Sequence, residues 1–216
     1  MKRMFDLFVA AIAILVLIPL LVLVIVILRL TGEGEVFFCQ TRIGRQRKPF
    51  GILKFATMLK DSQSLPGGDI TVRSDPRVLR FGKFLRKTKI NELPQLFNVL
   101  IGDMSLIGYR PLTPRVAALF DNAYWQQVGH LRPGLSGVGS IVFRDEEAVL
   151  GNATDREKTY RDVIVPQKAA LELWYANHVG MFTDLKLIIF TLVAVVIPDF
   201  DIRRYFAGLP VLAITE

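Results

Sequence analysis

The stretch KFLRKTKINELPQLFNVLIGDMSLIGYRP, residues 83–111, combines cations, an acid and residues that start helices. Arg86 and Lys89 come just before Asn91, whose side-chain oxygen can accept hydrogen bonds from the first turn of a helix. Pro94 would then lie within that first turn, where a missing N–H costs little. We therefore predict that a helix starts at Asn91, and that its positive dipole end and the neighbouring cations form an anion-binding site.

Glu92 adds a carboxylate to this cationic group. A carboxylate among cations is either a plain ion-pair partner or a metal ligand and catalyst of phosphoryl chemistry. From these residues alone the ion pair is the commoner case, and both interpretations stay open.

Residues 85–111 resemble the characteristic pattern of the bacterial sugar transferases, also called monotopic phosphoglycosyl transferases, which runs L-R-x-(S/T)-x-(L/I)-D-E-L-P-Q-L-x-N-V-L-x-G-D-M-S-(L/I)-(V/I)-G-P-R-P. Further blocks match that family in the same order: KRMFDLFVA at 2–10, VFFCQTRIGRQRKPFGILKFATM at 36–58, DPRVLRFGKFLR at 75–86 and LRPGLSGVG at 131–139. The resemblance therefore spans nearly the whole chain, except the loop at 61–74 and the C-terminal end.

The composition, taken without the family, favours membrane contact. The 216 residues are 51% hydrophobic with a mean hydropathy of +0.38, which is high for a chain with 22% charged residues. The net charge of +7 suits an anionic membrane face and anionic substrates. The single Cys39 cannot form an internal disulfide, and its apolar surroundings predict a small core residue.

The segment Leu7–Leu28 holds 22 residues without a charge, enough for a helix that crosses a bilayer. Pro19 near its middle favours a kink, and cations at both ends give no clear orientation, so both ends can lie on the cytoplasmic side. The resemblance implies a re-entrant hairpin broken near Pro19. It also implies a monotopic protein of the bacterial inner (cytoplasmic) membrane, with its catalytic domain on the cytoplasmic face.

The predicted fold class is α+β, with a small β element and a helical catalytic domain that carries interfacial amphipathic helices. Strands are expected at 36–40 and 50–58, and helices at 114–128, with Thr113 as cap, at 154–163, at 168–178 beyond a break near Pro166, and at 181–198. The basic residues between the two strands, Arg42, Arg45, Arg47 and Lys48, are interpreted as a solvated face near lipid headgroups, in preference to a substrate role for each. The domain organisation is a membrane helix at 1–29, a catalytic domain at 30–200 and a tail at 201–216.

The resemblance implies an enzyme that moves a sugar-1-phosphate from a nucleotide diphosphate sugar, most commonly a UDP-sugar, to undecaprenyl phosphate and releases UMP. In such enzymes the Asp of the Asp-Glu pair is the nucleophile and the Glu helps to hold Mg²⁺. Here Asn91 occupies the Asp position, and a neutral amide is a poor nucleophile. Three interpretations stay open: an active subgroup in which Glu92 or another acid takes over, a chain altered at this position, and a relative without catalysis.

The resemblance also implies roles for other residues, each beside a plainer alternative. Phosphate contacts are expected from Arg86, Lys89, Arg110 and Arg132, and Mg²⁺ contacts from Glu92 and Asp103. Arg132 can instead pin a loop, and Asp103 can instead cap a turn. The acids Asp145, Glu146 and Glu147 are candidates to support the site or to form a solvated charged turn. Tyr109 replaces the Pro of G-P-R-P, a change that would shift Arg110.

Three hypotheses from different classes follow. The leading one is the membrane-associated phosphoglycosyl transferase, acting at the first membrane step of capsule, O-antigen, exopolysaccharide or glycoprotein assembly. The second is a non-catalytic member of the same fold that binds polyprenyl phosphate or an assembly partner. The third, a nucleic-acid binder, rests on charge alone and lacks any recognisable module, so we expect no nucleic-acid partner. The sugar is not identified, and self-association is left open.

Overall fold

The structure is a computed structural model, and it describes residues 1–62, 75–144, 146, 150–151, 153–197 and 200–210. Its described part combines many helices with two small sheets. The α+β class predicted from the sequence is thus confirmed, with one long apolar helix at the N-terminus.

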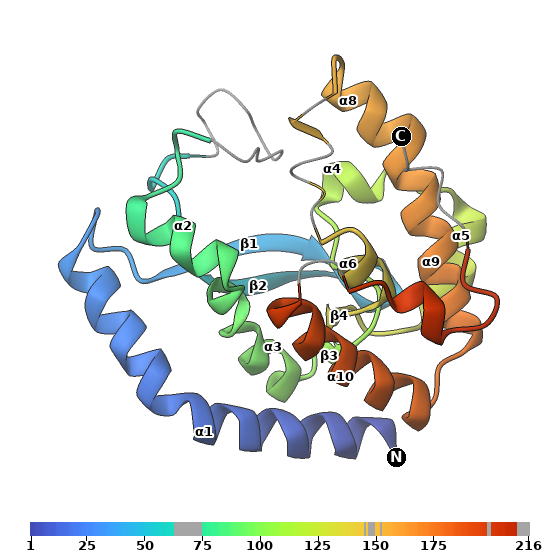
Figure 1. Cartoon of the computed structure of the whole chain (residues 1–216), viewed down its shortest axis with the longest axis horizontal. Helices are drawn as coiled ribbons and strands as arrows, with labels where there is room; N and C mark the ends of the chain where they lie inside the picture. Colours follow the sequence, from blue (N-terminus) through green and yellow to red (C-terminus); the bar gives the residue numbers. More distant parts are fainter. Residues whose placement is uncertain (63–74, 145, 147–149, 152, 198–199, 211–216) are drawn as a thin grey trace.

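Helix α1, Lys2–Leu30, is continuous, has Pro19 inside it, and runs along one side of the molecule with a bend part-way along (Figure 1). A proline inside a helix removes a backbone hydrogen bond and bends the helix. Among the described residues, α1 is the helix long and apolar enough to cross a membrane. Its apolar side chains are largely exposed, Leu15 and Val16 at 69% each, while Ala10 and Val24 pack on the rest of the protein.

Strands β1, Phe37–Ile43, and β2, Pro49–Phe55, pair antiparallel in register from Phe37 opposite Phe55 to Ile43 opposite Pro49. The predicted two-stranded element is therefore confirmed. Cys39 is exposed on β1, so the prediction of a core cysteine was wrong, because the outer face of this short hairpin is not covered.

The second sheet pairs β3, Ser105–Ile107, with β4, Gly134–Ser136, in parallel. The backbones of the two segments approach so closely that a Cβ on Gly134 would lie 2.2 Å from the backbone nitrogen of Gly108. This approach places the segment after β3 against β4, where the site described below is formed.

The predicted helix start at Asn91 was wrong. Helix α2, Arg80–Lys87, ends before Lys89, which adopts a left-handed conformation at φ 60°; a 3₁₀ turn, Ile90–Glu92, follows. Helix α3, Gln95–Ile101, begins only after Pro94. The left-handed residue turns the chain before Asn91, so the Asn91 side chain is buried instead of capping a helix.

The region predicted as one helix at 114–128 forms two, α4, Pro114–Ala117, and α5, Asn122–Val128. Thr113 caps α4 as predicted, through its side-chain oxygen and the N–H of Val116. The helix is divided because Asp121 provides a second cap, accepting from the N–H of Tyr124 at 2.8 Å.

The predicted break near Pro166 is absent from the described residues, which run without interruption through α8, Arg156–Thr159, a π turn, Tyr160–Ile164, and α9, Val165–Asn177. The wide π turn lies just before Pro166 and accommodates its missing N–H and its ring. Short α6, Val138–Val142, packs on α9, and α10, Met181–Val196, covers the two-stranded parallel sheet.

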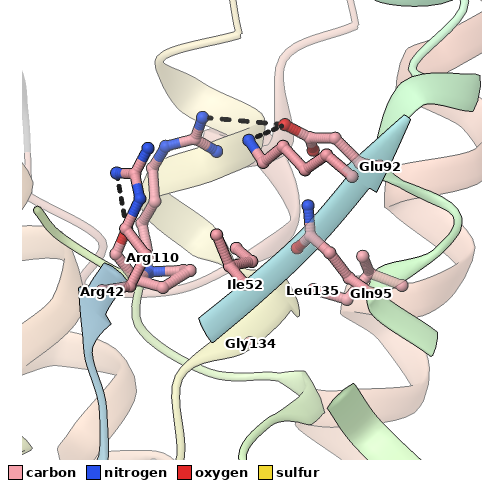
Figure 2. Close-up of a pocket in the computed structure, with 9 residues that line it drawn as sticks. Arg42, Ile52, Glu92, Gln95, Arg110, Gly134 and Leu135 are labelled. Carbon is pink, nitrogen blue, oxygen red and sulfur yellow. Dashed lines mark hydrogen bonds and ion pairs between the residues drawn. The ribbon is translucent and has the colours of Figure 1, made fainter. Parts of the chain in front are cut away.

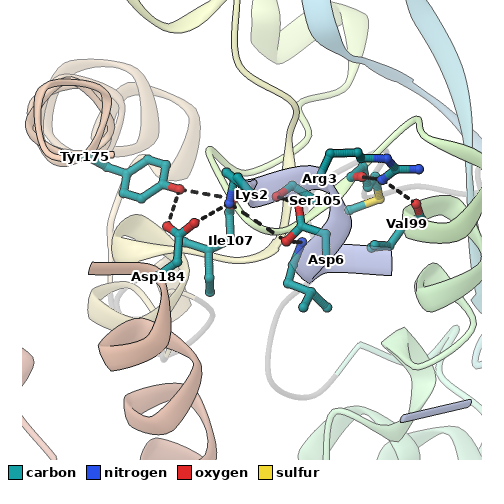
Figure 3. A network of polar contacts seen from close by, with 10 residues as sticks. Lys2, Arg3, Asp6, Val99, Ser105, Ile107, Tyr175 and Asp184 are labelled. Atoms are coloured by element: carbon teal, nitrogen blue, oxygen red, sulfur yellow. Dashed lines mark hydrogen bonds and ion pairs between the residues drawn. The ribbon is translucent and has the colours of Figure 1, made fainter. Parts of the chain in front are cut away.

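The N-terminus of α1 is fixed to the body by a polar network (Figure 3). Lys2 forms an ion pair with Asp184 at the start of α10, and the hydroxyl group of Tyr175 lies 2.7 Å from Oδ1 of Asp184. Ser105 donates to Asp6 at 2.7 Å. The apolar helix is thereby joined to α9, α10 and β3 through charged groups that are largely buried.

Candidate active site

A pocket opens where six segments meet, and Figure 2 shows the side chains that surround it. Its lining residues come from β1, β2, the 3₁₀ turn at Ile90–Glu92, the start of α3, the segment after β3, and β4: Arg42, Ile52, Lys54, Glu92, Gln95, Arg110, Pro111, Gly134 and Leu135.

Glu92 lies between two cations in this pocket. Its Oε1 is 3.2 Å from Lys54 Nζ and 3.9 Å from Arg110 Nη2. The Lys54 and Glu92 side chains are each 18% exposed, and Arg110 is 40% exposed. The three charges therefore lie where a ligand entering from solvent can reach them.

The electrostatics follow from this arrangement. Burial raises the pKa of Glu92, but the charges of Lys54, Arg110 and Lys89 outweigh it and bring that pKa to about 2. Burial lowers the pKa of Lys54 to about 8, although Glu92 opposes the change and Arg110 and Arg42 add to it. At neutral pH Glu92 is thus an anion and Lys54 is largely a cation.

Asn98 on α3 explains how the strand and the helix hold the pair together. Its Oδ1 accepts from the N–H of Leu53 at 2.9 Å, and its Nδ2 donates to the carbonyl oxygen of Gly51 at 2.8 Å. These two bonds lock β2 beside α3 and so set the position of Lys54 relative to Glu92.

Of the predicted site residues, the structure brings Glu92 and Arg110 into the pocket. Lys89 is exposed nearby, and its charge contributes to the low pKa of Glu92. Arg86 lies on α2 with Nη1 3.9 Å from the sulfur of Met58. Asn91 is 7% exposed, and within the described part of the chain its Oδ1 is buried without a hydrogen-bond partner.

The other predicted residues lie elsewhere. Arg132 donates from Nε to the carbonyl oxygen of Gly102 at 2.8 Å, at the C-terminal end of α3. Asp103 lies at the same end, 3.4 Å from Asn98 Nδ2. Glu146 pairs with Lys168 at 2.6 Å. The predicted acids Asp145 and Glu147 fall outside the described residues.

Two pocket residues, Lys54 and Arg42, did not figure among the predicted site residues. Lys54 is a lone cation inside the apolar strand sequence of β2, a signal that could have identified it. The interpretation of Arg42 as part of a solvated face was wrong, because it lines the pocket and donates from Nη1 to the carbonyl oxygen of Pro111 at 3.2 Å.

For Mg²⁺, Glu92 is the carboxylate among the described residues that line the pocket. Within the described ranges, no three His, Cys, Asp or Glu side chains come together as a protein-only metal site. Mg²⁺ in phosphate-handling enzymes is usually held by one or two carboxylates together with substrate phosphates and water. Glu92 can supply one such carboxylate in the pocket, whereas Asp103 lies at the opposite end of α3.

Residues 1–198 match the family model described as bacterial sugar transferase. The chain belongs to the bacterial sugar transferase family. It is 37% identical over 196 residues to the undecaprenyl-phosphate glucose phosphotransferase of Komagataeibacter xylinus. The matched region covers 88% of this chain and 35% of that protein. It is also 34% identical over 199 residues to the exopolysaccharide production protein PSS of Rhizobium leguminosarum bv. phaseoli, covering 90% and 94% of the two chains.

A third bacterial sugar transferase relative is the UDP-N-acetylgalactosamine-undecaprenyl-phosphate N-acetylgalactosaminephosphotransferase of Aeromonas hydrophila, 34% identical over 204 residues. That match covers 94% of this chain and 45% of the relative. The chain thus spans less than half the length of two of these relatives, while it matches nearly the whole of the Rhizobium protein.

Proposed function

We propose that this bacterial sugar transferase moves a sugar-1-phosphate from a nucleotide diphosphate sugar, in the first instance a UDP-sugar, to undecaprenyl phosphate, with release of UMP. The observation that carries the proposal is Glu92 held between Lys54 and Arg110 in an open pocket. Two of the named relatives are undecaprenyl-phosphate sugar phosphotransferases, which supports the same acceptor. The product would enter the assembly of an exopolysaccharide or capsule.

The charge of the pocket supports a diphosphate ligand. Among its described lining residues are the cations Arg42, Lys54 and Arg110 and the single carboxylate Glu92, a net charge of +2 at neutral pH. A nucleotide sugar brings a dianionic diphosphate. Lys54 and Arg110 can bind phosphoryl oxygens in place of the Glu92 carboxylate. The planar guanidinium group of Arg110 can donate two parallel hydrogen bonds to these oxygens. Binding of the donor would thus release the Glu92 carboxylate from its ion pairs.

The released carboxylate is the proposed nucleophile. One Glu92 oxygen attacks the phosphorus that carries the sugar, and the bond from this phosphorus to the UMP oxygen breaks. UMP leaves with the bonding electrons. A phosphate oxygen of undecaprenyl phosphate then attacks the same phosphorus and displaces Glu92, which gives undecaprenyl diphosphate-sugar. Glu92 would also help to hold Mg²⁺, which would supply charge neutralisation when bound. Lys54, Arg42 and Arg110 would stabilise the charge that develops on the phosphoryl oxygens.

The membrane arrangement is part of the proposal. Helix α1, bent and containing Pro19, would enter and leave one leaflet of the bacterial inner membrane, with the pocket on the cytoplasmic side. Helix α10 carries exposed apolar side chains along one face, among them Phe182 at 84%, Leu192 at 66% and Val196 at 78%. Such a face suits a helix that lies at the headgroup boundary, which would bring the pocket close to a lipid phosphate.

A second candidate function is favoured by one observation, the buried amide of Asn91 at the position of the family's nucleophilic Asp. A member without catalysis would bind undecaprenyl phosphate or an assembly partner in the same pocket.

The deciding experiment measures UMP release by the detergent-solubilised protein with Mg²⁺, undecaprenyl phosphate and a panel of UDP-sugars. Release that requires the lipid and one particular sugar supports the transferase and identifies the donor. No release with any donor, from protein shown to be folded, favours the binding function. Asn91→Asp is the companion variant: activity found in this variant and not in the wild type would identify a relative whose catalysis was lost at this position.

A further inference from the structure

Glu172 is a buried acid on α9, 3% exposed, which contacts the backbone of a pocket residue. Its Oε1 accepts a hydrogen bond from the backbone N–H of Arg110 at 3.3 Å. Arg110 in turn directs its guanidinium group toward Glu92. The Glu172 carboxyl group therefore fixes the main chain from which one of the pocket's cations extends.

Helix α6 also contacts this carboxyl group. A Cβ at Gly139 would lie 2.5 Å from Oε1 of Glu172 and 3.3 Å from its Cδ. Only a glycine leaves room there for the carboxyl group in its present position. The hydrogen bond to Arg110 thus also depends on the space that Gly139 of α6 leaves, shortly after Gly134 and Leu135 of the pocket.

The protonation state of Glu172 matters for the Arg110 side chain. Burial raises the pKa of Glu172 to about 8, against the opposing effects of the Arg110 N–H and of the charges on Lys168 and Arg110. Among the described residues, the charge of Glu172 also acts on the hydroxyl groups of Tyr109, Tyr124 and Tyr175. An ionised Glu172 would be a second anion near Arg110 and would compete with Glu92 and with an anionic ligand. A neutral Glu172 can accept from the backbone without that competition.

We propose that Glu172 is a positioning residue of the phosphate pocket: its carboxyl group fixes the main chain at Arg110 and so sets where the Arg110 guanidinium meets a diphosphate. The inference rests on the proposed function for the nature of the ligand, a diphosphate, and it does not depend on transfer taking place. Within the described part of the chain, the other carboxyl oxygen of Glu172, Oε2, is buried without a hydrogen-bond partner, and Glu172 is not among the residues that line the pocket.

The test is calorimetric binding of inorganic diphosphate, with Mg²⁺, to the full chain in detergent at neutral pH. We expect Glu172→Ala to bind about tenfold more weakly, because the Arg110 N–H loses its buried acceptor. Glu172→Gln keeps a neutral acceptor and is expected within about twofold of the wild type. Gly139→Ala should weaken binding by displacing the carboxyl group. Gly180→Ala, where an added Cβ meets nothing within 4 Å, is the matched control and should not change binding.

One readout separates positioning from a general structural role. In an Arg110→Ala background, Glu172→Ala should cause no further loss of diphosphate binding, because its effect passes through Arg110. The same loss in both backgrounds would overturn the proposal.

Failed folding of Glu172→Ala would leave the comparison to Glu172→Gln and Gly139→Ala. Tight diphosphate binding by Glu172→Gln and weak binding by Gly139→Ala would support the positioning role. Weak binding by Glu172→Gln and tight binding by Gly139→Ala would overturn it. A wild type that binds no diphosphate would overturn this inference and the proposed function together. A wild type that binds diphosphate but releases no UMP would overturn the proposed function alone.

Discussion

Lys54 Nζ lies 3.2 Å from Glu92 Oε1, which joins strand β2 to the turn before α3 across 38 residues of sequence. Each charge is stabilised by the other. Because neither side chain is fully buried, both remain accessible to a ligand. The sequence allowed two interpretations of Glu92, an ion-pair partner and a catalytic carboxylate. The pair is compatible with both, because a diphosphate that binds Lys54 would leave the Glu92 carboxylate free.

Glu92→Gln should reduce UMP release by about a hundredfold or more, because the amide can neither attack phosphorus nor neutralise Mg²⁺. The same assay with Glu157→Gln provides the control, since Glu157 is exposed, pairs with Arg115, and is not among the residues that line the pocket. Wild-type turnover by Glu92→Gln would remove Glu92 from both roles.

The covalent step makes a separate prediction. If Glu92 takes up the phosphosugar, labelled UMP should exchange into the UDP-sugar in the absence of undecaprenyl phosphate, because UMP release is then reversible without the acceptor. Glu92→Gln should show no exchange. A wild type that transfers sugar to the lipid but exchanges no label would indicate direct transfer between the substrates, with Glu92 acting only as a ligand.

Lowering the pH should destabilise the wild type more than it destabilises the Glu92→Gln variant. The pKa of Glu92 falls from 4.5 in the unfolded chain to about 2 in the folded protein, so the unfolded state binds more protons between these values. Its stabilising effect is fully present above pH 4.5 and is lost as the pH falls toward 2. Thermal unfolding across this range should show a steeper loss of stability in the wild type, by up to about 3 kcal/mol. Parallel curves would contradict the assignment of this titration to Glu92.

The sequence predicted the structural features that depend on interactions between residues close together in the chain. The alternation around residues 36–58 gave the hairpin, and Thr113 gave a helix cap, because both depend on neighbouring residues. The helix start at Asn91 failed because Lys89 adopts a left-handed conformation, for which its sequence carries no signal. The pairing of Lys54 with Glu92 depends on how Asn98 binds β2 to α3, a tertiary arrangement that spacing along the chain does not encode.

Arg110 and Arg132, both predicted to bind phosphate, should behave differently when replaced. Arg110→Gln should raise the KM for the donor about tenfold, because the guanidinium faces the pocket. Arg132→Gln should leave that KM within about threefold and lower the thermal stability, because Arg132 binds the carbonyl oxygen of Gly102 at the end of α3. Equal effects on KM, with unchanged stability in both variants, would instead assign Arg132 a direct phosphate contact.

The junction between α1 and α10 should control how firmly the apolar helix is attached to the catalytic body. Asp184 is 2% exposed, pairs with Lys2, and lies 2.7 Å from the Tyr175 hydroxyl group. Asp184→Leu removes the acceptor and leaves both partners without it, which should lower the free energy of unfolding by about 3 kcal/mol. The measurement is thermal unfolding in detergent, together with protease sensitivity of the segment that follows α1. Because the pocket lies on other segments, diphosphate binding below the melting temperature should stay within about twofold of the wild type. Simultaneous loss of diphosphate binding in folded protein would show that the position of α1 and the geometry of the pocket are coupled.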